Sequence, residues 1–132
     1  MRALIVEDDF LSRNILRDLV SEYGVCDLAV DGEEAIMAFD LAWEDGAPYD
    51  LIFMDIMMPG TNGLGAVKRI RAMEKERGIN GQRESKIVMT TALGDPKTVF
   101  EAYNRGGATS YVTKPITREK VAAEMRKAGL ID

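Results

Sequence analysis

The sequence predicts an α/β protein with a doubly wound, five-stranded parallel sheet and helices on both of its faces. Short apolar runs rich in β-branched residues lack the alternation of a half-exposed strand, which is typical of strands buried on both sides. Segments with apolar residues at helical spacing separate these runs. Because strand and helix alternate five times, right-handed crossovers and parallel strands are expected.

The first half of the chain supplies three strands and two helices. The apolar run at 3–6 predicts the first strand, a weaker run at 25–30 the second, and the run at 51–54 the third. Between them, apolar residues at helical spacing predict two helices whose core-facing sets are Leu11, Ile15, Leu19 and Tyr23, and Ala35, Phe39 and Trp43.

The second half continues the alternation. Strands are expected at 87–89 and 110–112, and segment 77–86, with two glycines and four charged residues, is expected to be a polar loop. Helical spacing predicts three further helices with the core-facing sets Leu64, Val67 and Ile70, then Val99 and Tyr103, then Val121, Met125 and Ala128.

Length and composition favour one globular domain. A chain of 132 residues fits a single domain of ~100 to 150 residues, so residues 1–132 are expected to form one unit without an output domain. Apolar residues make up 46% and charged residues 30%, unlike the composition of disordered chains. No apolar run approaches the ~20 residues that span a bilayer, so a cytoplasmic protein without membrane insertion is expected.

The charge and the lack of histidine exclude several function classes. A formal net charge of −5 argues against binding nucleic acid, because Lys and Arg carry most of that affinity. Without histidine there is no histidine-ligated zinc site, no serine–histidine triad and no phosphohistidine on this chain. The chemistry must come from carboxylates, hydroxyls and lysine.

Polar residues follow the expected strands where each strand ends. Glu7, Asp8 and Asp9 follow the first strand, and Asp55 follows the third. Thr91 follows the fourth strand and Lys114 the fifth. In an open α/β sheet, ligands bind beyond the carboxyl ends of the strands, where the strand order reverses. With the order 2-1-3-4-5, the acidic cluster lies directly beside Asp55.

Such a cluster of carboxylates requires a cation. Two like charges ~4 Å apart repel by about 4 kcal/mol at an effective dielectric constant near 20. Oxygen ligands without histidine or cysteine favour a hard divalent ion, and Mg²⁺ suits few carboxylates with retained waters and a phosphate. Lys114 would add a second positive charge and Thr91 a hydroxyl donor, so the set could neutralise a phosphoryl group.

The motifs resemble those of a known family. The stretch LIFMDIMMPGTNG at 51–63, VEDD at 6–9, Thr91-Ala92 and Lys114-Pro115 are similar to those of response-regulator receiver domains of two-component signalling. The resemblance covers essentially the whole chain, in order. It implies a flavodoxin-like (βα)5 fold and a stand-alone, chemotaxis-type switch rather than a turnover enzyme.

The resemblance also implies a role for each site residue. Asp55 resembles the acceptor that takes phosphate from the phosphohistidine of a histidine kinase or a histidine phosphotransfer protein. Asp8 would bind Mg²⁺ directly, Glu7 through water, and Met57 through its backbone carbonyl, with Mn²⁺ as a substitute metal.

The remaining roles concern the switch. By the same resemblance, Thr91 and Lys114 would bind the phosphoryl oxygens. Thr91 and Tyr111 would form the switch, which reshapes the face of the fourth helix, fifth strand and fifth helix for a downstream protein target. Apolar Met57 and Leu93 flank the acceptor and the threonine, so slow self-dephosphorylation is expected.

Other interpretations remain for single residues and for the whole chain. Asp9 is expected to cap a helix, and Tyr111 could be core packing. Asn62, where many relatives carry aspartate, also suits a turn. A Mg-dependent aspartyl-phosphate phosphatase acting on small phosphoesters is the main alternative, although Met57 stands where such enzymes place a second aspartate. A flavodoxin-type electron carrier and an inert interaction module are weaker alternatives.

Overall fold

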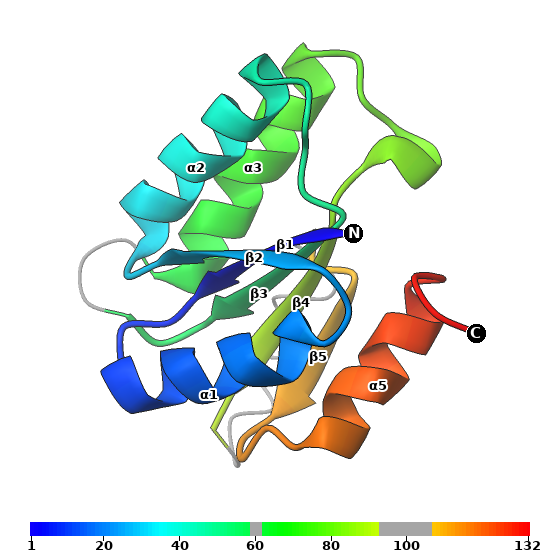
Figure 1. The fold of residues 1–132 in the computed structure, drawn as a ribbon. Helices are drawn as coiled ribbons and strands as arrows, with labels where there is room; N and C mark the ends of the chain where they lie inside the picture. The colour runs from blue at the N-terminus through cyan, green and yellow to red at the C-terminus, as the bar shows by residue number, and fades with distance from the viewer. Residues whose placement is uncertain (59–61, 93–106) are drawn as a thin grey trace.

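The computed structural model describes residues 1–58, 62–92 and 107–132. Five parallel strands form one sheet in the order β2-β1-β3-β4-β5, so the expected strand order is confirmed (Figure 1). The strands are β1 (Arg2–Val6), β2 (Val25–Ala29), β3 (Leu51–Asp55), β4 (Lys86–Thr91) and β5 (Ser110–Thr113). Four strands extend beyond the expected runs, whereas β2 ends one residue earlier than expected. The residues at the ends of β3 and β4, Asp55 and Thr91, still pair with their neighbours.

Helices cover both faces of the sheet. The described helices are α1 (Phe10–Ser21), α2 (Gly32–Glu44), α3 (Gly63–Glu76) and α5 (Arg118–Lys127). Figure 1 shows α2 and α3 on one face of the sheet and α1 and α5 on the other. The helix expected around Val99 and Tyr103 lies outside the described residues. In the parts of the chain that the structure describes, no helix has the length and apolarity needed to cross a membrane.

The sheet is buried on both faces, as its continuous apolar strands predict. In β3, Ile52 and Met54 belong to the cluster under α2 and α3, whereas Leu51 and Phe53 belong to the cluster under α1 and α5. Because successive side chains of a strand point to opposite faces, an unbroken apolar run is needed to fill both layers. This packing fixes where the carboxyl end of β3 lies.

Two expectations require correction. Leu16 and Val20 of helix α1 are buried, and Leu19 and Tyr23 of the expected set pack against the same cluster. The other two members of that set are exposed, Leu11 by 65% and Ile15 by 47%. Both stripes have helical spacing, so only the packing against β1 and β3 selects the buried one. Segment 77–86 is also more regular than a loop, because it contains a short 3-10 helix, Gly81–Arg83, before β4 begins.

Side-chain caps set where the helices begin. Asp9 accepts a hydrogen bond from the backbone N–H of Ser12 at 2.9 Å, so its expected role as the cap of α1 is confirmed. Asn62 does the same for α3 through the N–H of Gly65, also at 2.9 Å. Asparagine and aspartate cap helices about equally well. The asparagine at this position is therefore compatible with the helix that begins after the β3 loop.

Candidate functional site

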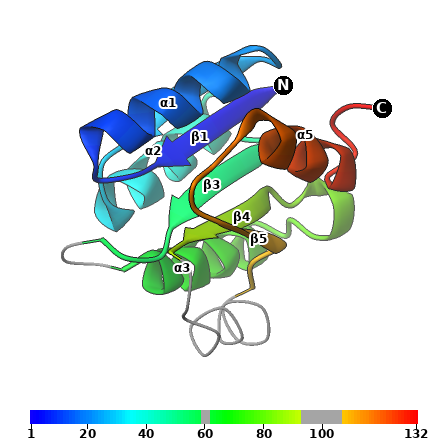
Figure 2. The same ribbon diagram turned by 90° about the horizontal axis from the view of Figure 1, so that it is seen from below.

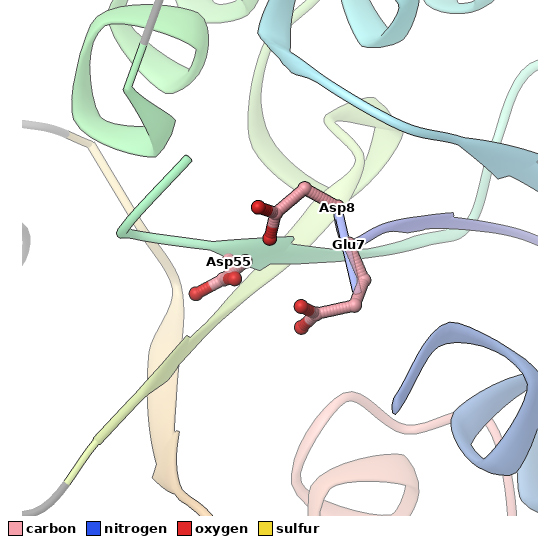
Figure 3. Close-up of side chains that lie close together, drawn as sticks. All are labelled: Glu7, Asp8 and Asp55. Carbon is pink, nitrogen blue, oxygen red and sulfur yellow. The ribbon is translucent and has the colours of Figure 1, made fainter. Parts of the chain in front are cut away.

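Three carboxylates meet at the ends of β1 and β3. Glu7 and Asp8 follow β1 directly, and Asp55 is the last residue of β3. One oxygen from each carboxylate lies within 4.8 Å of the others, as Figure 3 illustrates. β1 and β3 are neighbours whose arrows run in the same direction, which brings their carboxyl ends to one edge (Figure 2). The acidic cluster predicted from the sequence therefore exists.

The three acids differ in how the protein holds them. Glu7 is 3% and Asp55 is 4% exposed, whereas Asp8 is exposed. Glu7 accepts from the N–H of Asp9 at 3.3 Å, and Asp55 accepts from the N–H of Met57 at 3.3 Å. Within the described residues, the carboxylate of Asp8 has no hydrogen-bond or ion-pair partner. Asp8 is thus the acid whose oxygens are free for a ligand.

Lys114 bridges the two buried acids. Its Nζ lies 3.0 Å from Glu7 Oε2 and 3.4 Å from Asp55 Oδ2. Its own backbone N–H donates to the carbonyl of Thr91 at 2.7 Å, which anchors the segment after β5 to the end of β4. Burial works to lower the pKa of Lys114, but the hydrogen bond to Glu7 and the charge of Asp55 outweigh burial and raise that pKa. The ammonium group therefore stays charged.

One lysine does not balance three carboxylates. Burial, together with the nearby charge of Asp55, raises the pKa of Glu7 to about 7 although Lys114 opposes the rise. This rise comes first from burial, and the excess negative charge of the site follows from three carboxylates facing one lysine. Oxygen ligands with excess negative charge fit a hard divalent cation such as Mg²⁺. The residues present thus fit the metal expected from the sequence.

The raised pKa of Glu7 predicts how the stability of the metal-free protein depends on pH. The folded-state pKa of about 7 lies above the ordinary value of 4.5, so the folded state binds more protons between these two pH values. The free energy of unfolding is therefore expected to fall as pH rises through this window, by at most ~3 kcal/mol from Glu7. Urea unfolding in a chelator at several pH values measures this change.

The matched variant for that measurement is Glu7→Gln, which cannot ionise. The difference in unfolding free energy between the two proteins should change across the window, with the wild-type protein losing stability relative to the variant as pH rises. Parallel pH profiles for the two proteins would contradict the assignment.

The other predicted site residues, Thr91, Met57 and Tyr111, differ in burial and in contacts. Thr91 is 3% exposed, and its hydroxyl donates to the carbonyl of Ala92 at 3.2 Å rather than to Asp55. Met57 has a side chain that is 70% exposed, two residues after Asp55. Tyr111 lies on β5 opposite Met89 and is 39% exposed, so it is not plain core packing.

Sequence reasoning missed two residues that shape the site. Thr90 is the β4 partner of Asp55 in the sheet register and is 2% exposed. Gly63 packs so closely on β3 that a Cβ atom there would lie under 3.0 Å from the backbone carbonyl of Asp55. Its N–H also donates to the carbonyl of Ile56 at 3.0 Å. The glycines at positions 60, 63 and 65 of the sequence were the available signal, but only the packing shows that Gly63 must lack a side chain.

Comparisons with known proteins agree with this geometry. A family model described as "Response regulator receiver domain" matches residues 3–126. The "Two-component response regulator ORR41" of Oryza sativa subsp. japonica is 32% identical over 130 residues, which cover 98% of this chain and 95% of that protein. The "Chemotaxis protein CheY" of Treponema pallidum (strain Nichols) is 37% identical over 122 residues, 91% of this chain and 76% of that protein.

A solved structure is similar over nearly the whole chain. It is the co-crystal structure of the Saccharomyces cerevisiae histidine phosphotransfer protein Ypd1 with the receiver domain of the response regulator Ssk1. The TM-score is 0.83 at 30% identity, and the match covers 98% of this chain and 88% of the solved one.

Proposed function

Because the chain belongs to the response regulator receiver domain family, whose members are phospho-accepting signalling switches, we propose that Asp55 is the residue that accepts the phosphoryl group. One observation carries this proposal. Asp55 Oδ2 lies 3.4 Å from Lys114 Nζ, and one carboxylate oxygen of Asp55 lies within 4.8 Å of an oxygen of each of the other two acids. The Asp55 carboxylate therefore faces both a positive charge and the candidate metal ligands. Glu7 also contacts Lys114, so Asp55 is distinguished by its place at the end of β3, within the 51–63 stretch that resembles the acceptor motif of the family.

The metal site would be built from oxygens around Asp55. Asp8 and Asp55 would bind Mg²⁺ directly, Glu7 would bind through a water molecule, and the backbone carbonyl of Met57 would complete the protein ligands. Mn²⁺ would substitute because it accepts the same oxygen ligands. When bound, the metal supplies the positive charge that neutralises the phosphoryl oxygens.

The reaction requires little beyond positioning and charge. The carboxylate oxygen of Asp55 attacks phosphorus, the bond from phosphorus to the donor histidine nitrogen breaks, and an acyl phosphate forms on Asp55. Lys114, which already contacts Asp55, would pair with the phosphoryl oxygens. Thr91 would exchange its 3.2 Å hydrogen bond to Ala92 for one to the phosphoryl group.

A switch suits these residues better than a turnover enzyme. Receiver domains are in general signalling switches rather than turnover enzymes. A phosphatase working through an aspartyl phosphate would need an acid or base where Met57 stands, and a thioether cannot serve as one. Met57 is also mostly exposed. The phosphoester hydrolase alternative therefore lacks an acid or base at the position where such enzymes place it.

The output surface would include β5 and α5. Movement of Thr91 toward the phosphoryl group would alter β4, whose strand pairing places Met89 beside Tyr111 on β5. Tyr111 is partly exposed and can change its packing without opening the core. The downstream target would be a protein that binds the face of β5, α5 and the helix expected before β5 in one of the two states of the switch.

The phosphodonor would dock on an apolar rim beside the acceptor. The apolar rim consists of Phe10, Leu11 and Ile15 on α1 and Met57 after β3, with exposed fractions of 72%, 65%, 47% and 70%. A pocket of about 460 Å³ lies next to it, with Ile15, Leu16 and Ile116 among its walls and Glu7 and Lys114 also lining it. Clustered exposed apolar residues are typical of protein interaction sites. The similar receiver crystallised with a phosphotransfer protein supports a donor of that kind.

Polar substitutions in the apolar rim should slow phosphoryl transfer from a protein donor but not from a small-molecule donor. We expect Leu11→Ser with Ile15→Ser to reduce the rate of phosphotransfer from a phosphorylated histidine phosphotransfer protein by about tenfold or more, because interface apolar anchors dominate binding. Labelling by acetyl phosphate should not change. Leu41→Ser is the matched control, since Leu41 is 55% exposed on α2, on the opposite face of the sheet. If the double variant lost phosphorylation equally with the protein donor and with acetyl phosphate, the substitutions would have damaged the fold or the reaction itself, and the docking proposal would be contradicted.

The proposed function is tested by incubation with acetyl phosphate and Mg²⁺ followed by intact mass measurement. We expect one added phosphoryl group that is absent when the metal is chelated. Release of free phosphate from small phosphoesters without accumulation of the labelled protein would favour the phosphatase instead. A protein that takes no label in the presence of Mg²⁺ would contradict the proposal.

A further inference from the structure

The eight methionines divide sharply by exposure. Met57 is 70% exposed and Met37 is 62% exposed, while Met1 is partly buried. The other five are buried, each at 8% exposure or less: Met54, Met58, Met73, Met89 and Met125. Because oxidation of a thioether requires contact with the oxidant, Met57 and Met37 should react before the buried methionines.

Met57 is the exposed methionine beside the acceptor. Its backbone N–H donates to Asp55 Oδ1 at 3.3 Å, so its side chain leaves the chain next to the carboxylate that would carry the phosphoryl group. Met37, in contrast, lies on α2, a helix that supplies none of the clustered acids. The chain therefore has one exposed thioether next to the acceptor, that of Met57, and a second exposed thioether, that of Met37, on a helix that supplies no residue to the acidic cluster.

We propose that Met57 is a redox modification site that sets the lifetime of the phosphorylated state. A peroxide oxidises the thioether sulfur by two electrons; its O–O bond breaks, one oxygen forms the sulfoxide, and the other leaves as water. The side chain changes from an apolar group with a weak acceptor into a polar group with a strong acceptor oxygen. The inference rests on phosphorylation at Asp55.

The consequence follows from how an acyl phosphate is lost. Hydrolysis needs a water molecule near phosphorus, and an apolar side chain at position 57 offers that water no strong acceptor. A sulfoxide oxygen there can accept a hydrogen bond from the attacking water. One net hydrogen bond corresponds to a rate change of about two- to tenfold. Oxidation should therefore shorten the phosphoryl half-life, and reduction of the sulfoxide by a methionine sulfoxide reductase should restore it.

The test compares decay of the label before and after oxidation. The full chain is treated with dilute hydrogen peroxide, and peptide mass spectrometry establishes oxidation at Met57 and Met37. Untreated and treated protein are labelled with acetyl phosphate and Mg²⁺, the donor is removed, and intact mass follows the loss of the phosphoryl group. We expect a half-life about two- to tenfold shorter after treatment, with recovery after reductase treatment.

Two variants identify the responsible residue. In Met37→Leu, peroxide should shorten the half-life as in the wild type. In Met57→Leu, the ratio of treated to untreated half-lives should be about one, because leucine cannot be oxidised. An unchanged half-life in protein fully oxidised at Met57, or a peroxide effect that persists in Met57→Leu, overturns the inference while the proposed function stands. Absence of label in the untreated protein overturns both.

Discussion

Asp55→Asn is expected to abolish phosphorylation by acetyl phosphate and Mg²⁺, with labelling at least about 100-fold below that of the wild type. An amide of the same size lacks the carboxylate oxygen that attacks phosphorus. Lys114 keeps its 3.0 Å contact with Glu7, so the surrounding structure does not depend on the lost charge. Intact mass spectrometry after a fixed incubation measures the effect directly.

The control is a second aspartate replaced in the same way. Asp31→Asn removes one negative charge at the cap of α2, where Asp31 accepts from the N–H of Glu34 at 2.8 Å. Asparagine supports that cap, so both folding and labelling should be retained. If Asp55→Asn is labelled at the wild-type level, another residue accepts the phosphoryl group, and the proposed function is contradicted.

Asp8→Asn is expected to weaken Mg²⁺ binding by about 100-fold or more, since even residues behind the metal ligands change affinity by ~10 to 100-fold. Asp8 is the exposed acid of the cluster, and its carboxylate has no partner among the residues that the structure describes. Its substitution therefore removes a ligand without breaking a hydrogen bond of the fold. Calorimetric titration with Mg²⁺ measures the affinity, and labelling at limiting Mg²⁺ should fall in parallel.

The neighbouring residue provides the control for Asp8. Asp9→Asn removes a charge one position away, but Asp9 is the cap of α1 and does not belong to the acidic cluster. The affinity for Mg²⁺ should change by less than about threefold, which is the size of a screened charge effect near the surface. If Asp8→Asn and Asp9→Asn weaken binding equally, general electrostatic attraction rather than ligation explains the site.

The effects of Asp55→Asn and Asp8→Asn distinguish the loss of the phosphoryl acceptor from the loss of a metal ligand. Asp55→Asn should lose labelling at every Mg²⁺ concentration, whereas Asp8→Asn should recover part of its labelling when Mg²⁺ is raised. This difference follows from the positions of the two acids. Asp55 faces Lys114 at 3.4 Å and is almost fully buried, while Asp8 reaches the cluster from the exposed side.

By itself, the sequence determined the parallel sheet and the membership of the acidic cluster, and the resemblance to the family implied the strand order. Strands buried on both faces must be continuously apolar, so β3 and β4 stand out as short apolar runs, and the polar residues at their ends mark the edge where ligands bind. Asp55, Glu7 and Asp8 were predicted in this way. Periodicity did not place the buried stripe of α1, because Leu11 and Ile15 have the same helical spacing as Leu16 and Val20.

Only the tertiary structure decided which groups touch and how they are charged. It placed Lys114 on both Glu7 and Asp55, left the Asp8 carboxylate without a partner among the described residues, and showed that Gly63 must lack a side chain beside Asp55. It also showed that the side chains of the apolar rim, which includes Met57, are exposed to solvent. The physical reason is range: local spacing encodes which face of a strand or helix is apolar, whereas contact distances and burial depend on packing between segments that are distant in the chain.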